Sequence, residues 1–340
     1  VRIHGTDPLH LHHEDVTLEG ATTSFQVHLR VPPEDFAAAY NAALLATVPA
    51  LAACGNAPLF LGHRLWEETR VVLFKQAVDE RPEAMGVGVH GAHAGYPPAR
   101  VTFGHGFARR GIAELMAETC ALWTPLLPLC SKEDDPEALV RGGAAPGLAE
   151  LRLHNGTVWR WVRPIYDPVD GGHLRLELRA LPAGPTVADM VAGAALQLGL
   201  VLWLTPRVER MISRVPFACV QHGFYRAAQE GLEAELLWPS ERGHSPERVG
   251  ARALLLRLLP CALEGLSQAG VDGGEASAAL GLMEERVRGG QTGARWLRRS
   301  FDALAGRHSR EDALRRLVEA YQERSLSDEP VHRWTALRVA

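Results

Sequence analysis

Lysine is almost absent from this 340-residue chain, in which Lys75 and Lys132 stand alone among 36 basic residues that are otherwise arginine. Neither lysine follows a glycine, which excludes the Gly-Lys-Ser/Thr loop that cradles phosphate in many nucleotide-binding proteins. Gly-x-Ser-x-Gly, His-Glu-x-x-His and Ser-x-x-Lys motifs are absent too, so serine hydrolase and zinc protease chemistry have no local support. Any binding of phosphate must therefore use arginine, whose planar guanidinium group can hold two oxygen atoms at once.

Cysteine, long apolar runs and net charge are also scarce. The five cysteines form no Cys-x-x-Cys and lie in or beside apolar runs, which predicts reduced, mostly buried thiols of a cytoplasmic protein. The longest apolar run, residues 190–204, contains Gln197 and is too short to span a bilayer, so it predicts a buried helix. With 36 basic and 40 acidic residues the chain is too balanced for a nucleic-acid partner. We therefore expect neither a nucleic-acid nor a membrane partner.

Three segments alternate between apolar and polar residues, as half-buried strands do. Residues 21–31 place one apolar row, ending at Val31, opposite a polar row of Ser24, Gln26, His28 and Arg30. Residues 157–162 and 173–179 read as two further strands joined by a turn over residues 164–172. The last of these buries leucines at 174, 176 and 178 and leaves a polar row of His173, Arg175, Glu177 and Arg179 facing solvent.

Helical periodicity covers residues 34–54, 107–123 and 186–204 and most of 230–324, with Thr186 as a predicted helix cap. Residues 66–78 are ambiguous, and residues 82–106 and 132–146 read as a long loop and a polar connection. This pattern predicts an α+β fold built on an antiparallel sheet. We expect a sheet-containing region over residues 1–215 and a mainly helical region over residues 216–340 packed on it.

Two other motifs admit different functions. Gly86, Gly88 and Gly91 spell Gly-x-Gly-x-x-Gly, but no strand precedes them and no helix follows, so a plain loop is favoured over a dinucleotide site. Histidines cluster near the start of the chain and in the long loop, beside Glu14 and Asp15, which leaves a metal hydrolase open as an alternative. Their spacing favours solvated side chains over zinc ligands. The clustered histidines are His10, His12, His13, His90, His93 and His105.

The polar rows on the strands carry the strongest chemical signal. One interpretation is an antiparallel sheet with one solvated face, for which such alternation is routine. The other is a magnesium-phosphate site, because arginines on both sides of Glu177 provide planar donors for phosphate and the carboxylate provides an oxygen ligand for a hard cation. Trp159 and Trp161 beside this region are expected to pack in the core.

Motifs on these strands resemble those of a known family. The segments ATTSFQVHL (residues 21–29), HNGTVWRWVRP (154–164) and GGHLRLELRALPAGPT (171–186), with NAPLFLG (56–62) and the region of Arg70, are similar to carboxylate-amine ligases of the glutamate-cysteine ligase family. That family shares its active-site architecture with glutamine synthetase. The resemblance implies a glutamine synthetase-like fold with ATP and Mg²⁺ as cofactors. It assigns Glu177 and Gln26 to the metal, Arg179 and Arg163 to catalysis, and His28, Arg175 and Arg70 to ATP.

The implied reaction is amide formation through an acyl phosphate, with a glutamate-like carboxylate and an amino-acid amine as small-molecule substrates. Relatives bring further metal-binding glutamates from an acidic strand that has no counterpart in residues 1–20, where Glu14 and Glu19 are candidates by proximity alone. We expect that the N-terminal part of the sheet is missing from this chain. The alternative is a degenerate relative that acts as a binding protein. The amine acceptor and the oligomeric state stay open.

The resemblance also carries a geometric expectation. The strand of Gln26 and His28 and the strand of Glu177 and Arg179 should lie in one antiparallel sheet, with these side chains on one concave face together with Arg163. The leucines and their apolar counterparts on the first strand should face the helices, because a register slip of one residue would place charges in the core.

Overall fold

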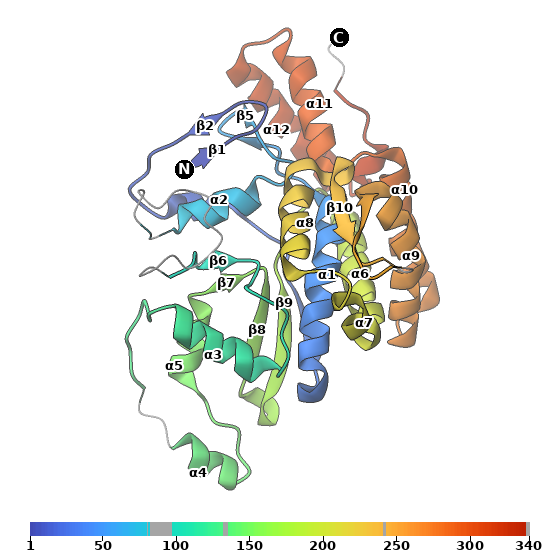
Figure 1. Ribbon diagram of the computed structural model, residues 1–340. Coiled ribbons are helices and arrows are strands. Elements are labelled where there is room, and N and C mark those ends of the chain that lie inside the picture. The colour runs from blue at the N-terminus through green and yellow to red at the C-terminus, as the bar shows by residue number, and fades with distance from the viewer. Residues whose placement is uncertain (80, 82–96, 132–134, 241–242, 338–340) are drawn as a thin grey trace.

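A three-stranded antiparallel sheet positions the polar residues of interest (Figure 1). The computed structural model describes residues 1–79, 81, 97–131, 135–240 and 243–337. Strands β3 (Val27–Val31), β9 (His173–Leu178) and β8 (Val162–Asp167) lie in the order β3-β9-β8. His28 and Arg163 stand opposite Glu177 on its two neighbouring strands, which confirms the expected sheet and its register.

The leucine face of this sheet packs on helix α1 (Phe36–Cys54), as the alternation predicts. Leu176 and Leu178 are fully buried, and Leu29 and Leu174 pack partly buried against the same core. Helix α1 is buried on almost every side because its many alanines let neighbours approach from all directions. Trp161 is buried in this core, in agreement with its expected packing role.

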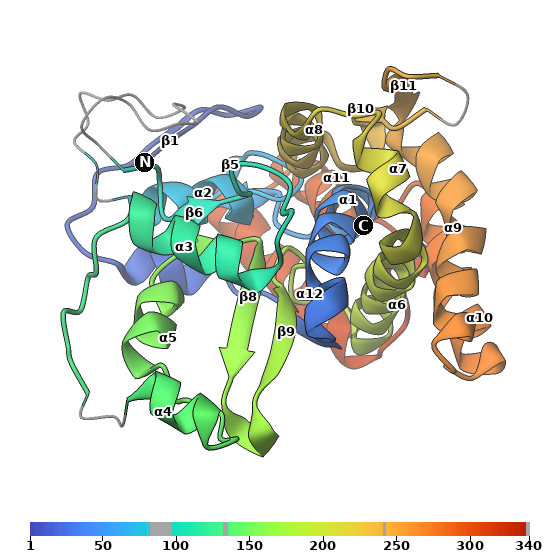
Figure 2. The same cartoon turned by 60° about the horizontal axis from the view of Figure 1, so that its bottom comes forward.

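Further helices surround α1 on the side away from the sheet (Figure 2). Helices α6 (Val187–Leu204) and α8 (Phe217–Glu230) contact α1 directly, and α9 (Ala251–Gln268) and α10 (Gly273–Gly289) pack on α6. Thr186 caps α6 by accepting a hydrogen bond from the backbone of Asp189. Helices α11 (Gly293–Ala305) and α12 (Arg310–Leu326) enclose a smaller core around Trp296 and Trp334.

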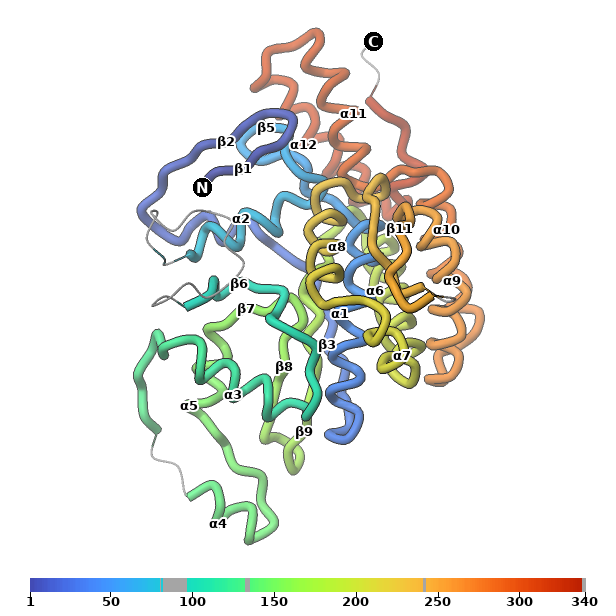
Figure 3. The backbone as a smooth tube through the Cα atoms, in the orientation of Figure 1, coloured from blue at the N-terminus to red at the C-terminus, as the bar shows by residue number. Residues whose placement is uncertain are grey.

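Shorter elements border the sheet and the helices (Figure 3). Hairpins pair β1 (Arg2–Ile3) with β2 (Leu9–His10), β4 (Leu59–Phe60) with β5 (His63–Arg64), and β10 (Glu235–Trp238) with β11 (Glu247–Gly250). Strand β6 (Val101–Thr102) runs parallel to β7 (Trp159–Arg160). The remaining helices are α2 (Arg70–Ala77), α3 (Ile112–Leu122), α4 (Pro136–Arg141), α5 (Ala149–Gly156) and α7 (Val208–Ile212).

Several boundaries differ from the sequence-based expectations. The first strand covers 27–31 rather than 21–31, which leaves Gln26 just outside it. Residues 164–167 extend β8 instead of forming a turn, because β8 is an edge of its sheet, where Pro164 can lack a ladder hydrogen bond. The connection over 132–146 contains α4, capped by Asp135, and the β10–β11 hairpin interrupts the region expected to be helical.

One apolar core runs through residues on both sides of position 215, since it includes Leu178 and Leu200 as well as Phe224 and Leu255. The division into two regions at that position stays a prediction. None of the five cysteines forms a disulfide bond. Cys54 is buried, but Cys120 and Cys130 are exposed, so the expectation of mostly buried thiols is wrong for these two.

Two helical stretches, over residues 33–54 and 187–212, have the length and apolar composition of membrane spans. Their apolar windows are 89% and 50% buried within the fold. The first is therefore a core helix, and the second, which contains the apolar run singled out in the sequence, has half of its apolar window buried.

Helices α6 and α9 cross at two glycines. A Cβ atom on Gly199 would overlap the carbonyl oxygen of Ala262, and a Cβ atom on Gly265 would overlap the carbonyl oxygen of Gly199. Because these obstacles are backbone atoms, they cannot move aside as a flexible side chain can.

We expect Gly199→Ala and Gly265→Ala each to lower the free energy of unfolding by about 1–3 kcal/mol, the cost typical of overpacking a core. Gly281→Ala is the matched control, because a Cβ atom there meets nothing within 4 Å on helix α10. It should leave stability unchanged or raise it by up to about 1 kcal/mol through better helix propensity. Urea unfolding measures all three, and equal stability of Gly199→Ala and the control would contradict the close crossing.

Candidate active site

Glu177 lies at the centre of the polar sheet face, between arginines from its own strand and the next. One carboxylate oxygen, Oε2, lies 3.0 Å from Arg163 Nη2, and Oε1 lies 3.0 Å from Arg179 Nε. His28 approaches from the other side, with Nε2 3.7 Å from Oε2. The Glu177 side chain is only 5% exposed, so the expectation that it faces solvent is wrong. The arginine side chains fold over it and remove it from water.

Arg70, the first residue of α2, joins this cluster from the opposite wall. It donates from Nε to Glu68 Oε1 at 3.1 Å and from Nη2 to the carbonyl oxygen of Ala180 at 2.5 Å. Its guanidinium group also lies 5.6 Å from the ring centroid of Trp161. Glu68 is fully buried, and burial raises its pKa while Arg70 acts in the opposite direction. Arg70 is thus held rigidly beside the sheet.

Arg179 is crowded by positive charge. Burial lowers the pKa of Arg179 to about 10, and Arg163 and Arg70 act in the same direction, while Glu177 partly offsets them. The guanidinium group also lies 5.8 Å from the ring centroid of Phe74. Burial and neighbouring positive charges disfavour the charged form of this guanidinium group, and a second anion nearby would stabilise it. The local electrostatics therefore favour an anionic ligand at this position.

A small pocket of 190 Å³ opens beside Arg70 and Arg179. Gln26 lines it, as does Glu19 from the turn that precedes the first sheet strand. Thr22, Thr23 and Ser24 add hydroxyl groups on the same side. The pocket therefore combines two guanidinium groups with one carboxylate and several neutral donors, which is a lining suited to a small molecule with separated charges.

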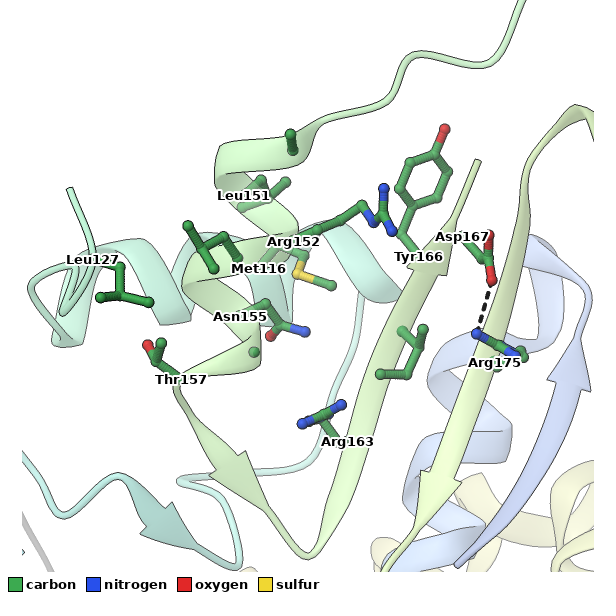
Figure 4. Close-up of a pocket in the computed structure, with 14 residues that line it drawn as sticks. Met116, Leu127, Leu151, Arg152, Asn155, Thr157, Arg163, Tyr166, Asp167 and Arg175 are labelled. Carbon is green, nitrogen blue, oxygen red and sulfur yellow. Dashed lines mark hydrogen bonds and ion pairs between the residues drawn. The ribbon is translucent and has the colours of Figure 1, made fainter. Parts of the chain in front are cut away.

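A larger pocket of 670 Å³ lies on the other side of Arg163, between the sheet and helix α5 (Figure 4). Arg163 and Arg175 project into it from β8 and β9, and Arg152 reaches in from α5. Arg175 Nη2 lies 2.9 Å from Asp167 Oδ2. Asn155 donates to the carbonyl oxygen of Pro164 at 2.9 Å, which fixes α5 to the strand.

Several buried N–H groups of these arginines have no acceptor among the described residues. They are Nε of Arg163, Nε of Arg175 and Nη1 of Arg179. A buried donor without a partner costs about 1–3 kcal/mol. Arg163 and Arg175 line the larger pocket and Arg70 and Arg179 line the smaller one, so both pockets carry positive charge that an anionic ligand would offset. We call these four residues the arginine face.

The structure brings the predicted site residues together. Arg163 and Arg175 line the larger pocket, Gln26, Arg70 and Arg179 line the smaller one, and Glu177 with His28 lies between them. Sequence reasoning assigned no role to Glu68, Arg152, Asn155 and Asp167. Asn155 lies within the segment HNGTVWRWVRP and Glu68 lies beside Arg70, but no pattern of residue type and spacing marks either one. Asp167 precedes a proline, which in the sequence indicated a turn and not a site residue. In the structure the strand β8 continues to Asp167.

The described residues do not assemble a magnesium site around Glu177. Magnesium in proteins takes several oxygen ligands, whereas both oxygens of Glu177 already accept from arginines. No group of three His, Cys, Asp or Glu side chains in the described part of the chain is placed to hold a metal ion. The assignment of Glu177 and Gln26 to Mg²⁺ stays a prediction, and no step below depends on it.

The remaining motif residues do not converge on this site. His10, His12 and His13 belong to the N-terminal segment, where Glu14 lies 4.0 Å from His12 on the exposed surface. Gly86, Gly88, Gly91, His90 and His93 lie outside the described residues. Glu19, in contrast, lines the small pocket, and its charge acts on Arg179.

The sequence profile of glutamate-cysteine ligase family 2 (GCS2) matches residues 9–320, which is nearly the whole chain. No curated protein matches the chain.

The pH behaviour of His28 tests the geometry around Glu177. Partial burial lowers the pKa of His28 below 6.5, Glu177 raises it, and Arg175 and Arg163 lower it. The folded state then binds fewer protons than the unfolded state in this range, so the contribution of His28 to stability is present above pH 6.5 and is lost as the pH falls through the folded pKa.

We expect Glu177→Gln to lower the pKa of His28 further, because the negative charge that raises it is removed while Arg163 and Arg175 remain. NMR titration of the imidazole ring measures the change. Glu150→Gln is the control, because Glu150 is exposed and its substitution should leave the pKa of His28 unchanged. An upward shift in Glu177→Gln would contradict the contact.

Proposed function

The chain belongs to glutamate-cysteine ligase family 2, a family of carboxylate-amine ligases, and we propose that it forms an amide by an ATP-dependent reaction through an acyl phosphate. The observation that carries the proposal is the arginine face. Arg163 and Arg179 pair with the buried carboxylate of Glu177, and Arg70 and Arg175 lie beside them with Glu68 and Asp167 as their partners. Three of these four arginines hold N–H groups without an acceptor among the described residues.

The two pockets suit two different anionic substrates. The pocket of 670 Å³ has room for a nucleotide, with Arg163, Arg175 and Arg152 as phosphate donors. The pocket of 190 Å³ fits a small carboxylic acid held by Arg70 and Arg179. Glu19 in the same pocket could accept an ammonium group, which favours an α-amino acid such as glutamate as the carboxylate substrate.

The chemistry requires that two anions approach each other. When bound, ATP supplies the phosphoryl group that activates the carboxylate toward the amine. Arg179 lines the smaller pocket, Arg163 lines the larger one, and both contact Glu177. We therefore assign to Arg179 the stabilisation of the negative charge that develops on the phosphoryl group as it passes between the two pockets. Such preorganised donors lower a barrier because they need no reorganisation during the reaction. Glu177 acts as a positioning residue that keeps both guanidinium groups apart and in place.

A second candidate function is a binding protein on the same fold. The observation that favours it is that Glu177 belongs to no group of three or more His, Cys, Asp or Glu side chains placed to hold a metal ion in the described part of the chain. Such a protein would bind nucleotide or amino acid at the arginine face without joining them.

Incubation of the chain with ATP, Mg²⁺, glutamate and a panel of amino acids separates these functions. We expect phosphate release that requires both carboxylate and amine, together with an amide product detected by mass spectrometry. Binding of ATP in calorimetry without phosphate release supports the binding protein. If the chain neither binds ATP nor turns it over, both proposed functions are contradicted.

Arg179→Lys tests whether Arg179 stabilises the negative charge on the phosphoryl group during its transfer. A lysine keeps the charge but cannot span two oxygen atoms, so we expect kcat to fall by about 100-fold to 1000-fold, or roughly 3–4 kcal/mol, while KM for ATP changes little. Arg248→Lys on β11 is the control, because its side chain is 73% exposed and away from the arginine face. A raised KM with unchanged kcat would mean that Arg179 contributes only uniform binding.

A further inference from the structure

Glu68 is a fully buried carboxylate that the proposed reaction does not use directly. It lines neither pocket of the arginine face. Its backbone is fixed on two sides, since its N–H donates to the carbonyl oxygen of Ala228 on α8 at 2.8 Å and it forms an isolated bridge with Ala57. A buried charge is costly unless it is paired and hydrogen-bonded, so the partners of Glu68 indicate its role.

Each carboxylate oxygen of Glu68 has one donor. Oε1 accepts from Nε of Arg70 at 3.1 Å, and Oε2 accepts from the backbone N–H of Asn56 at 3.0 Å. Arg70 is itself buried, with only 4% of its surface exposed. Glu68 and Arg70 therefore form a buried ion pair, in which the loss of either partner leaves an uncompensated charge.

One nitrogen of the Arg70 guanidinium group is left for a ligand. Nε is bound to Glu68, and Nη2 donates to the carbonyl oxygen of Ala180 at 2.5 Å. Nη1 has no hydrogen bond to the described residues, and it is not one of the buried nitrogens that lack a partner. Since Arg70 lines the small pocket, Nη1 is the nitrogen that a ligand there can reach.

The two bonds made by the protein fix the direction of this nitrogen. A guanidinium group is planar and its donors keep fixed angles, so holding Nε at Glu68 and Nη2 at Ala180 also sets where Nη1 points. A hydrogen bond from a guanidinium group to a carboxylate is short and directional, so a shift of the whole group weakens it.

We infer that Glu68 is a positioning residue, which fixes Arg70 so that Nη1 meets the carboxylate group of the substrate in the small pocket. This role rests on the proposed ligase function, which places a small carboxylic acid in that pocket. Glu68 touches neither substrate and acts through Arg70. Its loss should therefore weaken binding of the carboxylic acid and spare the phosphoryl transfer assigned to Arg179.

Glu68→Gln in the ligase assay tests this role. Glutamine has nearly the same volume, but it carries no charge and replaces one acceptor oxygen with an NH2 group, which cannot accept from Arg70 or Asn56. We expect KM for glutamate to rise by about tenfold or more, the effect of one hydrogen bond to a charged group, and kcat to change by less than about threefold. Loss of the negative charge alone would strengthen the attraction of Arg70 for an anion, so a rise in KM reports displacement of the guanidinium group.

Glu68→Asp is a second variant that keeps the buried pair charged and so does not leave Arg70 uncompensated. Its side chain is one carbon shorter, which moves the acceptor away from Arg70. We expect KM for glutamate to rise by about threefold or more, because the charge is present and its position is wrong. A variant that merely folds less completely would lower the apparent kcat and leave KM unchanged, so the division between KM and kcat separates positioning from a structural role.

Glu67→Gln is the matched control. Glu67 is the adjacent residue, its side chain is only 12% exposed, and it pairs with Arg298 Nη2 on α11 at 3.4 Å instead of with Arg70. KM for glutamate should change by less than about twofold. Addition of Glu68→Gln to Arg70→Met should also change KM by less than about twofold, because substitutions that act through the same contact are not additive.

Crystal structures of the unaltered protein and of Glu68→Gln give a measurement that does not depend on turnover. We expect Nη2 of Arg70 to move out of hydrogen-bond distance of the carbonyl oxygen of Ala180 in the variant. Where the chain binds glutamate without turning it over, the dissociation constant from calorimetry takes the place of KM in every comparison.

Several results would overturn the proposal and leave the ligase function standing. They are an unchanged or lowered KM in either Glu68 variant, a fall in kcat alone, an equal rise of KM in Glu67→Gln, full additivity with Arg70→Met, and an Arg70 that keeps its place in the Glu68→Gln crystal. If the unaltered protein neither turns over nor binds glutamate, the proposed function itself fails, and Glu68 then has no substrate to position.

Discussion

The pairing of Glu177 with Arg163 and Arg179 is the interaction on which the functional face depends. A buried carboxylate needs charged partners, and removing one partner of such a pair typically costs about 3–5 kcal/mol. The partners come from the next strand and from two residues further along the chain, so they meet only if β8 and β9 keep their register. A slip of one residue would carry these charges into the core around α1 and leave leucines in the pockets. The same constraint therefore fixes both the core and the site.

Arginine replaces lysine in every part of this arrangement. Its planar group binds Glu177 through one nitrogen and holds its other N–H donors in fixed directions, whereas a lysine would concentrate its charge and its donors at a single atom. Arg70 extends the arrangement from a different element, and it is held by the fully buried Glu68 and by the backbone of Ala180. Helix α2 thus presents Arg70 to the smaller pocket from the side opposite the sheet.

Much of the sheet and of the candidate site was predictable because alternation has a direct physical meaning. Leu174, Leu176 and Leu178 must share one face, and this places Arg175, Glu177 and Arg179 on the other. The helix α1 and the cap at Thr186 follow from equally local rules. The burial of Glu177 was not predictable, because it depends on arginines folding over it from positions that the alternation shows only as exposed. The turn expected from residue 164 onward was wrong for a related reason. Pro164 can continue a strand only at the edge of a sheet, and the sequence does not show that β8 lies at an edge.

The sequence alone determined which residues can share a face, that arginine must perform any phosphate binding, and that the chain resembles carboxylate-amine ligases. These are properties of residue type, spacing and motif, which are fixed before folding. Tertiary structure decided which face becomes enclosed, how α5 and α2 form two pockets of different size, and that Glu19, Arg70 and Arg179 meet in one of them. These features arise from contacts between segments far apart in the chain, and their cost or gain depends on burial, which no local pattern contains.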